Sequence, residues 1–162
     1  MRLLPLLLVT TMTTAPVFLQ GQTFQDGLDA YDARDYRTAL EIFQPLAEEG
    51  NARAQYGLGV MYLSGDGVPQ DFSKAVRWFQ LAAEQGDADA QYNLGWMGRN
   101  GIGISMSYGE AAKWFRMAAE QGDAGAQYKL GVMYKNGELG SQDYVEAVRW
   151  YRMAAEQGNA SA

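Results

Sequence analysis

One 36-residue unit recurs along this chain, and the recurrence limits the folds that the sequence can adopt. The peptide Ala-Ala-Glu-Gln-Gly begins at Ala82, Ala118 and Ala154, and its last glycine continues a series of the same spacing that starts at Gly50. An aromatic pair, Trp-Phe or Trp-Tyr, begins four residues before the peptide in every copy. A fixed period of this length is typical of proteins in which each structural unit packs against its neighbours along a line.

Each unit is predicted to form two helices. In the first half of one unit, Ala54, Leu58 and Met61 are spaced i, i+4 and i+7, which places them on one helical face. In the second half, Ala75 and Phe79 begin a similar apolar stripe. The predicted fold class is therefore all-α, a superhelical solenoid of antiparallel helix pairs.

Glycines at the centre of the first helices are unexpected in a helical pattern. They occur at Gly59, Gly95 and Gly131, always directly after a leucine. A glycine inside a helix costs about 1 kcal/mol relative to alanine. A cost that recurs in register indicates close packing, and we expect each glycine to lie against an alanine of the partner helix.

The ends of the helices carry recognisable capping residues. Asp71, Ser107 and Asp143 precede the second helices and are predicted to be N-caps. Glu110 and Glu146 stand three residues after two of them, which predicts capping boxes. The glycine that ends each unit is predicted to terminate the second helix in a left-handed conformation.

A divergent unit precedes the three close copies. Gly27 corresponds to Gly59 but lies 32 rather than 36 residues upstream, so the loop of the first unit is shorter by four residues. The sequence therefore predicts one solenoid over 22–162 with four helix-pair repeats, at about 24–50, 51–86, 87–122 and 123–158.

Composition excludes several classes of function. The chain of 162 residues contains neither cysteine nor histidine, which removes disulfides, thiolate nucleophiles, Ser-His-Asp triads and almost every zinc site. Its net charge of −6 argues against nucleic-acid binding. We therefore expect no enzymatic activity, no cofactor, no metal and no catalytic residue; a cell-wall-related hydrolase is the least favoured alternative.

The first 21 residues resemble a secretory signal peptide. Arg2 is followed by a short apolar run, Leu3 to Val9, and then by a threonine-rich stretch. The run is too short for a membrane span, so its removal would leave a protein without stable membrane insertion. The sequence predicts an exported protein, periplasmic or secreted; the alternative is an uncleaved amphiphilic tail.

The repeated pattern resembles the Sel-one-like repeat family, which is related to tetratricopeptide repeats. Ala-x-x-x-Leu-Gly-x-x-Tyr is followed by Gly-x-Gly and then by Ala-x-x-Trp-x-x-x-Ala-Ala-x-x-Gly, closely over 51–158. The resemblance implies a right-handed superhelix whose first helices line a concave face. It also implies a non-enzymatic adaptor and, in exported bacterial members, contact with envelope or host proteins. A regulatory or inhibitory protein that captures one specific polypeptide is the alternative.

If that geometry applies, three positions in each first helix face the groove, where a protein or peptide partner would bind. The candidate residues are Tyr56, Val60, Leu63, Tyr92, Trp96, Arg99, Tyr128, Val132 and Lys135. Aromatic and arginine side chains dominate the energetics of many interfaces. The alternative is that the tyrosines pack between adjacent repeats and leave only their hydroxyl groups in water.

Two features depart from the repeated pattern, one in the third repeat and one at the end of the sequence. Gly98 stands where the neighbouring repeats have Tyr62 and Tyr134, which we expect in the core, and Trp96 stands where they have valine. Trp96 then either refills the space beside Gly98 or serves as a binding anchor. The sequence ends at Ala162 without a polar capping element, so either the sequence is truncated, or the last hydrophobic face is covered by a partner or by self-association.

Overall fold

The computed structural model describes residues 23–158, and this part of the chain folds into eight α-helices. Nearly all helices have 13 residues, the exception being the shorter α1. Their bounds are α1 Phe24–Asp32, α2 Tyr36–Glu48, α3 Ala52–Ser64, α4 Phe72–Glu84, α5 Ala88–Asn100, α6 Tyr108–Glu120, α7 Ala124–Asn136 and α8 Tyr144–Glu156.

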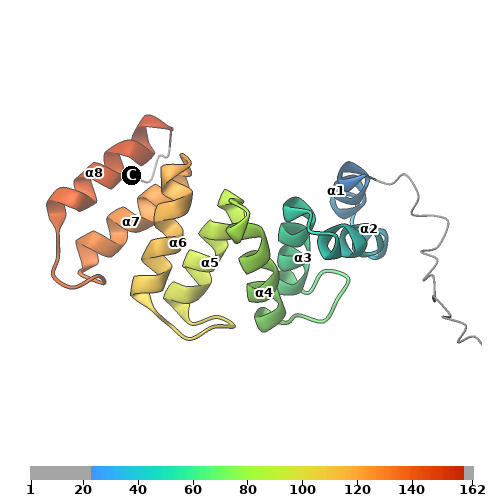
Figure 1. Cartoon of the computed structure of the whole chain (residues 1–162). Coiled ribbons are helices and arrows are strands. Elements are labelled where there is room, and N and C mark those ends of the chain that lie inside the picture. The colour runs from blue at the N-terminus through green and yellow to red at the C-terminus, as the bar shows by residue number, and fades with distance from the viewer. Residues whose placement is uncertain (1–22, 159–162) are drawn as a thin grey trace, which may run out of the picture.

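The helices follow one another along a curved row in chain order (Figure 1). α1 lies at one end of the row and α8 at the other, and each helix packs chiefly against its predecessor and its successor. Four helix pairs result: α1–α2, α3–α4, α5–α6 and α7–α8. The predicted all-α solenoid is confirmed, whereas the predicted signal peptide over 1–21 lies outside the described residues.

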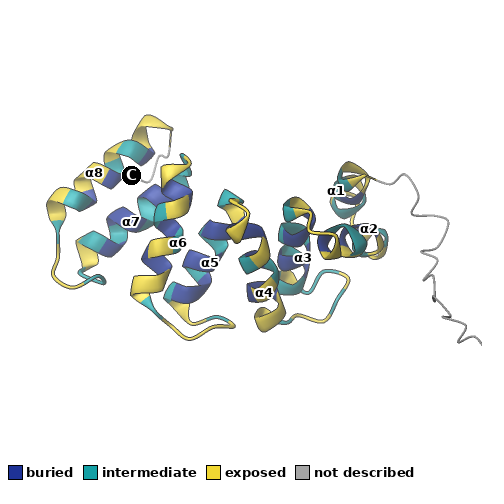
Figure 2. Ribbon diagram, in the orientation of Figure 1, coloured by how far each residue is buried: buried dark blue, intermediate teal, exposed yellow. Residues whose placement is uncertain are grey.

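The hydrophobic core is divided among the junctions between repeats. The middle cluster combines Phe79 and alanines of α4 with Leu94 and Met97 of α5, and the clusters on either side join α2 to α3 and α6 to α7. Figure 2 shows buried residues on the inner sides of successive helices throughout the row. Each repeat thus buries its apolar residues largely against the next repeat, as expected for a solenoid.

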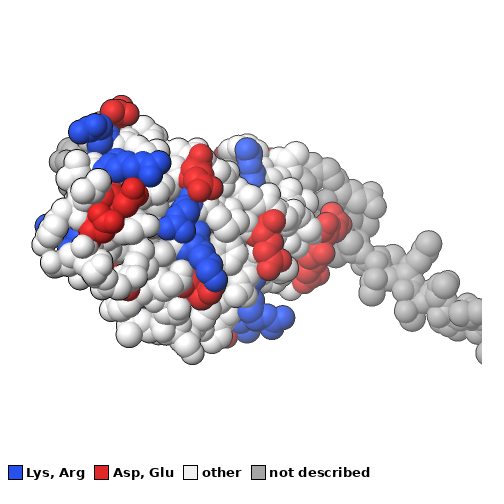
Figure 3. All heavy atoms as spheres, turned by 60° about the vertical axis from the view of Figure 1, so that its left-hand side comes forward, with Lys and Arg blue, Asp and Glu red and all other residues white. Residues whose placement is uncertain are grey.

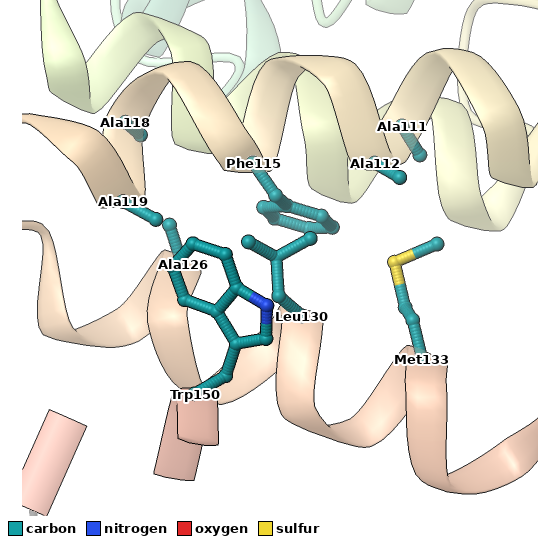
Figure 4. Close-up of a cluster of buried hydrophobic side chains, with 9 residues drawn as sticks. All are labelled: Ala111, Ala112, Phe115, Ala118, Ala119, Ala126, Leu130, Met133 and Trp150. Carbon is teal, nitrogen blue, oxygen red and sulfur yellow. The ribbon is translucent and has the colours of Figure 1, made fainter. Parts of the chain in front are cut away.

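Small residues let these helices approach one another. Figure 4 shows the α6–α7 cluster, in which Phe115 meets Leu130 at the centre and Trp150 of α8 lies beside them. Ala111 and Ala118 of α6 are completely buried around this contact. The aromatic ring fills the space that the alanines leave, which gives the dense packing of a protein interior.

The recurring glycines pack against aromatic rings, so the prediction of an alanine partner is wrong. A Cβ atom added to Gly59 would lie 2.5 Å from the ring of Phe79, and one added to Gly95 would lie 2.7 Å from that of Phe115. The same arrangement places Gly131 against the Tyr151 ring. The first helix lacks a side chain at the point where the aromatic residue of its partner helix crosses it.

The predicted N-caps are confirmed, but the capping boxes are not complete. The side chain of Ser107 accepts from the backbone N–H of Glu110, as in a capping box. The backbone N–H of Ser107, however, donates to the carbonyl of Gly98 in the preceding helix, and the Glu110 carboxylate pairs with Lys113. The N–H of Asp143 is likewise taken by a first-helix carbonyl. The loop packs back on α5 and α7 and satisfies these donors there.

Buried glutamines connect three helices at each junction. Gln91 on α5 is only 1% exposed. Its amide nitrogen donates to the carbonyl of Ala83 at 3.1 Å, and its amide oxygen accepts from Gln121 at 2.8 Å. Gln55 and Gln127 make the corresponding pairs of hydrogen bonds. A buried amide with both groups satisfied fixes the register of α4, α5 and α6.

Within residues 23–158, no helix has the length and apolar character that crossing a membrane requires.

Candidate functional site

The nine candidate residues lie on α3, α5 and α7, three on each helix. Within each helix they are spaced i, i+4 and i+7, so they share one side of it. We call the surface formed by these residues, together with the equivalent side of α1, the first-helix face. Contacts with the rest of the chain differ among the three positions.

The tyrosines of the first position are half-buried packing residues. Tyr56 lies with its ring centroid 5.7 Å from that of Phe79, and Tyr92 lies 5.7 Å from Phe115. Tyr128 contacts the ring of Tyr151 in the same way. Burial raises the pKa of the Tyr56 and Tyr92 phenols, and nearby aspartates raise it further. The packing description therefore applies to the rings, whereas their contact with a partner stays a prediction.

Trp96 contacts two hydrophobic clusters. Its half-buried side chain packs against both the α4–α5 cluster and the α6–α7 cluster. Tyr62 and Tyr134 are half-buried rather than in the core, so the expectation of a lost core tyrosine at Gly98 is wrong. A Cβ added to Gly98 would meet only Ala111, at 3.8 Å. Trp96 therefore joins neighbouring repeats; whether it also anchors a partner stays a prediction.

The other two residues of the middle position, Val60 and Val132, are half-buried. Val60 packs against the α4–α5 cluster with part of its side chain open to the groove. Both valines are smaller than Trp96, so the size of the side chain at the middle position varies along the first-helix face.

The third position holds repeats together at one junction. Arg99 forms a two-pronged ion pair with Glu138, through Nε to Oε2 at 2.8 Å and Nη2 to Oε1 at 2.6 Å. The hydrogen bond from Arg99 lowers the pKa of the Glu138 carboxyl, and the bond to Glu138 raises the pKa of Arg99. Arg99 is thus occupied within the chain, whereas Lys135 is exposed and Leu63 is half-buried.

Residues at the positions of Arg99 and Glu138 also meet between the first and second repeats, but there the contact has different chemistry. The hydroxyl of Tyr31, which corresponds to Arg99, donates to Asp66, which corresponds to Glu138, at 2.8 Å. Burial, together with this carboxylate, raises the pKa of Tyr31 to about 12. At the middle junction, Leu63 and Ile102 take these positions, and both pack against the α4–α5 cluster. Phenol–carboxylate, aliphatic–aliphatic and guanidinium–carboxylate pairs therefore follow one another along the solenoid.

A hollow of about 80 Å³ opens between α1 and α3. Its lining is apolar except for one guanidinium and two phenols, and consists of Phe24, Leu28, Tyr31, Phe43, Arg53, Tyr56, Gly57 and Val60. Only Tyr56 and Val60 of these were predicted from the sequence. The other lining residues were not predicted, because the hollow exists where α3 lacks a side chain. Gly57 stands at the position where α5 has Asn93 and α7 has Lys129.

Charge of both signs is distributed over the surface. Figure 3 shows acidic and basic side chains interspersed on the face in view, without an extended basic area. In the described range 23–158, no three acidic side chains come together in an arrangement that would hold a metal ion.

The outer side of α8 exposes several large apolar side chains. Val148 is 54% exposed there, whereas its counterparts Val76 and Ala112 are 5% and 4% exposed because a following repeat covers them. Tyr144 and Val145 extend the same surface. Self-association through this last repeat stays a prediction.

Comparison with known proteins identifies the repeats. The Sel1 repeat model matches four times, at residues 21–51, 52–87, 88–123 and 124–159, which together include all of the described residues 23–158. The four predicted repeats and the family resemblance are confirmed. Among curated proteins, none matches the sequence.

Solved structures of other repeat proteins resemble this one. The crystal structure of a Sel1 repeat protein from Oxalobacter formigenes is 39% identical, with a TM-score of 0.80 over 85% of this chain and 56% of that one. A protective antigen of uropathogenic Escherichia coli strains, displaying an SLR fold, is 35% identical, with a TM-score of 0.74 over 85% of this chain and 34% of that one. This chain therefore spans little more than half of the first protein and a third of the second.

Cysteine-rich protein B of Helicobacter pylori shares the fold alone. It is 20% identical, with a TM-score of 0.54 over 65% of this chain and 96% of that one. The family model matches four repeats, the fold is a solenoid of helix pairs, and two solved structures have sequence identities above one third. The chain belongs to the Sel1 repeat family.

Proposed function

We propose that this protein is an exported scaffold that binds other polypeptides through its first-helix face, at the bacterial envelope or at the surface of a host cell. Sel1 repeat proteins generally mediate protein–protein interactions. The exported location and the use of this particular face are proposed in addition to this general role.

The hollow between α1 and α3 is the observation that carries the choice of face. It exposes apolar side chains from two successive first helices at one point, next to the half-buried Tyr56. Binding sites for polypeptides concentrate their affinity in such partly preformed apolar pockets, often with tyrosine at the rim. Arg53, an exposed residue in the lining of the hollow, supplies a positive charge that can orient a bound segment.

Site-specific photo-crosslinking tests which face is used. A photoreactive residue is placed at Asp89 or at Lys135 on the first helices of the full chain, and adducts are collected from bacterial envelope extracts and host-cell lysates. The matched controls are Arg77, Lys113 and Arg149, which are exposed on the second helices. We expect the same polypeptide adducts from the first-helix positions and none from the controls. Adducts from the second helices alone would contradict the proposed face.

Export is tested separately, because the proposed signal peptide lies in residues 1–21. The full chain and a chain lacking these residues are expressed in a Gram-negative bacterium, and the cells are fractionated. We expect the full chain in the periplasm or the medium, with an intact mass that shows removal of the leader. Equal retention of both chains in the cytoplasm would refute export and leave the binding proposal standing.

A further inference from the structure

The hollow between α1 and α3 differs from the rest of the first-helix face in both shape and charge. At its centre Gly57 has no side chain, and Val60 is much smaller than the Trp96 that stands at the same position of α5. The floor is Phe43, whose ring a Cβ at Gly57 would approach to 3.0 Å. The space is therefore created chiefly at Gly57, where α3 departs from both α5 and α7, beside a valine that α7 shares.

Its size selects the kind of side chain that fits. The volume is about 80 Å³. An engineered apolar cavity of about 150 Å³ accommodates benzene. Roughly half that space is better filled by a branched aliphatic side chain, such as that of leucine, isoleucine or valine, than by an aromatic ring. Because the lining is almost entirely carbon, a polar side chain would lose its hydration without gaining hydrogen bonds.

One unpaired charge lies at the rim of the hollow. Arg53 is exposed in the first turn of α3 and makes no hydrogen bond or ion pair with any other residue in 23–158. The equivalent position carries Asp89 on α5 and Gly125 on α7, so this positive charge belongs to the hollow and not to the repeat. A guanidinium has the geometry to bind a carboxylate through two parallel hydrogen bonds.

From this combination we infer that the hollow binds a polypeptide segment in which a branched aliphatic residue stands next to a carboxylate. The aliphatic side chain enters between α1 and α3, and the carboxylate pairs with Arg53. The carboxylate belongs either to an aspartate or glutamate side chain or to the C-terminus of the partner. This inference rests on the proposed polypeptide-binding function and specifies its ligand.

A random peptide library displayed on phage, selected on the immobilised full chain, provides the test. We expect enrichment of peptides with Leu, Ile or Val within two positions of Asp or Glu, or of the free C-terminus in a C-terminally displayed library. The enriched peptide is then synthesised with a free and with an amidated C-terminus, and with Asp or Glu changed to the amide. The form that loses affinity identifies the source of the carboxylate.

Variants of the protein locate the binding site. Val60→Trp fills the hollow, and Val132→Trp makes the same change on α7, away from it. We expect Val60→Trp to lower affinity for the peptide about tenfold or more, in line with loss of a buried aliphatic side chain, and Val132→Trp to leave it unchanged. Arg53→Asp, on an exposed position, should weaken binding at least about fivefold and favour peptides with Lys or Arg in place of the acid.

Three results would overturn the inference. Enriched peptides whose binding resists both Val60→Trp and Arg53→Asp, but which crosslink to another first-helix position, would leave the proposed function intact and place the ligand elsewhere. Preference for an aromatic residue over an aliphatic one would contradict the size argument. Absence of any enriched peptide, together with absence of first-helix crosslinks, would refute both the inference and the proposed function. Circular dichroism of each variant establishes that it is folded.

Discussion

Two glycines of α5 lie one turn apart and should respond in opposite ways to the same substitution. Gly95 faces the ring of Phe115, and a Cβ there would lie within 2.7–2.8 Å of three ring atoms. Gly98 faces Ala111, and a Cβ there would make an ordinary contact at 3.8 Å. Both are buried in the same helix, so Gly95→Ala and Gly98→Ala differ chiefly in what the added methyl group meets.

The magnitudes follow from two effects. Either alanine gains about 0.5–1 kcal/mol of unfolding free energy, because glycine is entropically unfavourable inside a helix. At Gly95 this gain is opposed by overpacking, which costs about 1–3 kcal/mol when the neighbour cannot move. Phe115 is completely buried at the centre of the α6–α7 cluster, so its ring has little room. We expect Gly98→Ala to stabilise the protein and Gly95→Ala to be about 1–3 kcal/mol less stable than Gly98→Ala.

Thermal and denaturant unfolding, followed by circular dichroism, measure this difference. For a chain of this size, 1 kcal/mol corresponds to a shift in Tm of about 2–4 °C. The matched control is the Phe115→Leu background, in which the ring is gone and Gly95→Ala should lose most of its penalty. Equal stability of the two alanine variants, or a penalty that persists in the Phe115→Leu background, would refute the explanation of the recurring glycines as sites of aromatic packing.

Three further changes test other contacts. Glu138→Gln should lower the free energy of unfolding by about 1 kcal/mol at pH 7, because it breaks the ion pair with Arg99. Since the pKa of Glu138 is lowered in the folded state, this difference from the unmodified chain should persist above the ordinary pKa of 4.5 and disappear as the pH falls below it. Urea titrations at several pH values would measure it. Gln91→Glu should destabilise the protein at pH 7 and less so near pH 4, because only the protonated acid can donate to the carbonyl of Ala83; a pH-independent loss would contradict this. Gly103→Ala should lower the Tm by several degrees, because Gly103 has φ of +69° and an added Cβ would lie 2.5 Å from a backbone carbonyl oxygen; an unchanged Tm would show that the loop can move.

The sequence predicts the solenoid well because its information is local and periodic. The spacing of Ala54, Leu58 and Met61 specifies a helical face, and all three are buried. The N-cap at Asp71 likewise depends only on residues within one turn, and it is present. Features that repeat in register reinforce one another, so helix number, order and pairing follow from the pattern itself.

Contacts between repeats are less accessible from the sequence. The partner of Arg99 lies 39 residues downstream in a loop, and spacing along the chain does not indicate that these two positions meet. The glycine partners were misassigned because spacing along one helix does not specify which side chain of the next helix crosses it. The recurring glutamine after Ala54 was an available indication of the buried hydrogen bonds, since a polar residue repeated on an apolar face requires partners.

The site was the least predictable part. Of the residues that line the hollow, Gly57 and Arg53 matter because they differ from their counterparts in α5 and α7. Pattern analysis emphasises what repeats, whereas a specific binding site arises where one copy departs from the others. The size and the unpaired charge of the hollow become visible only when α1 and α3 are placed side by side.

The changing pairs at the junctions also bear on how such a gene can evolve. Repeats of equal length invite duplication and loss by unequal recombination, and removal of 87–122 would leave the helix pairs in frame. It would also place the aliphatic Leu63 opposite the carboxylate of Glu138 and remove Arg99, its partner. A partly buried carboxylate without its cation is unfavourable. The order of the repeats therefore affects stability at this boundary, and we expect a chain that lacks 87–122 to be less stable for a reason unrelated to binding.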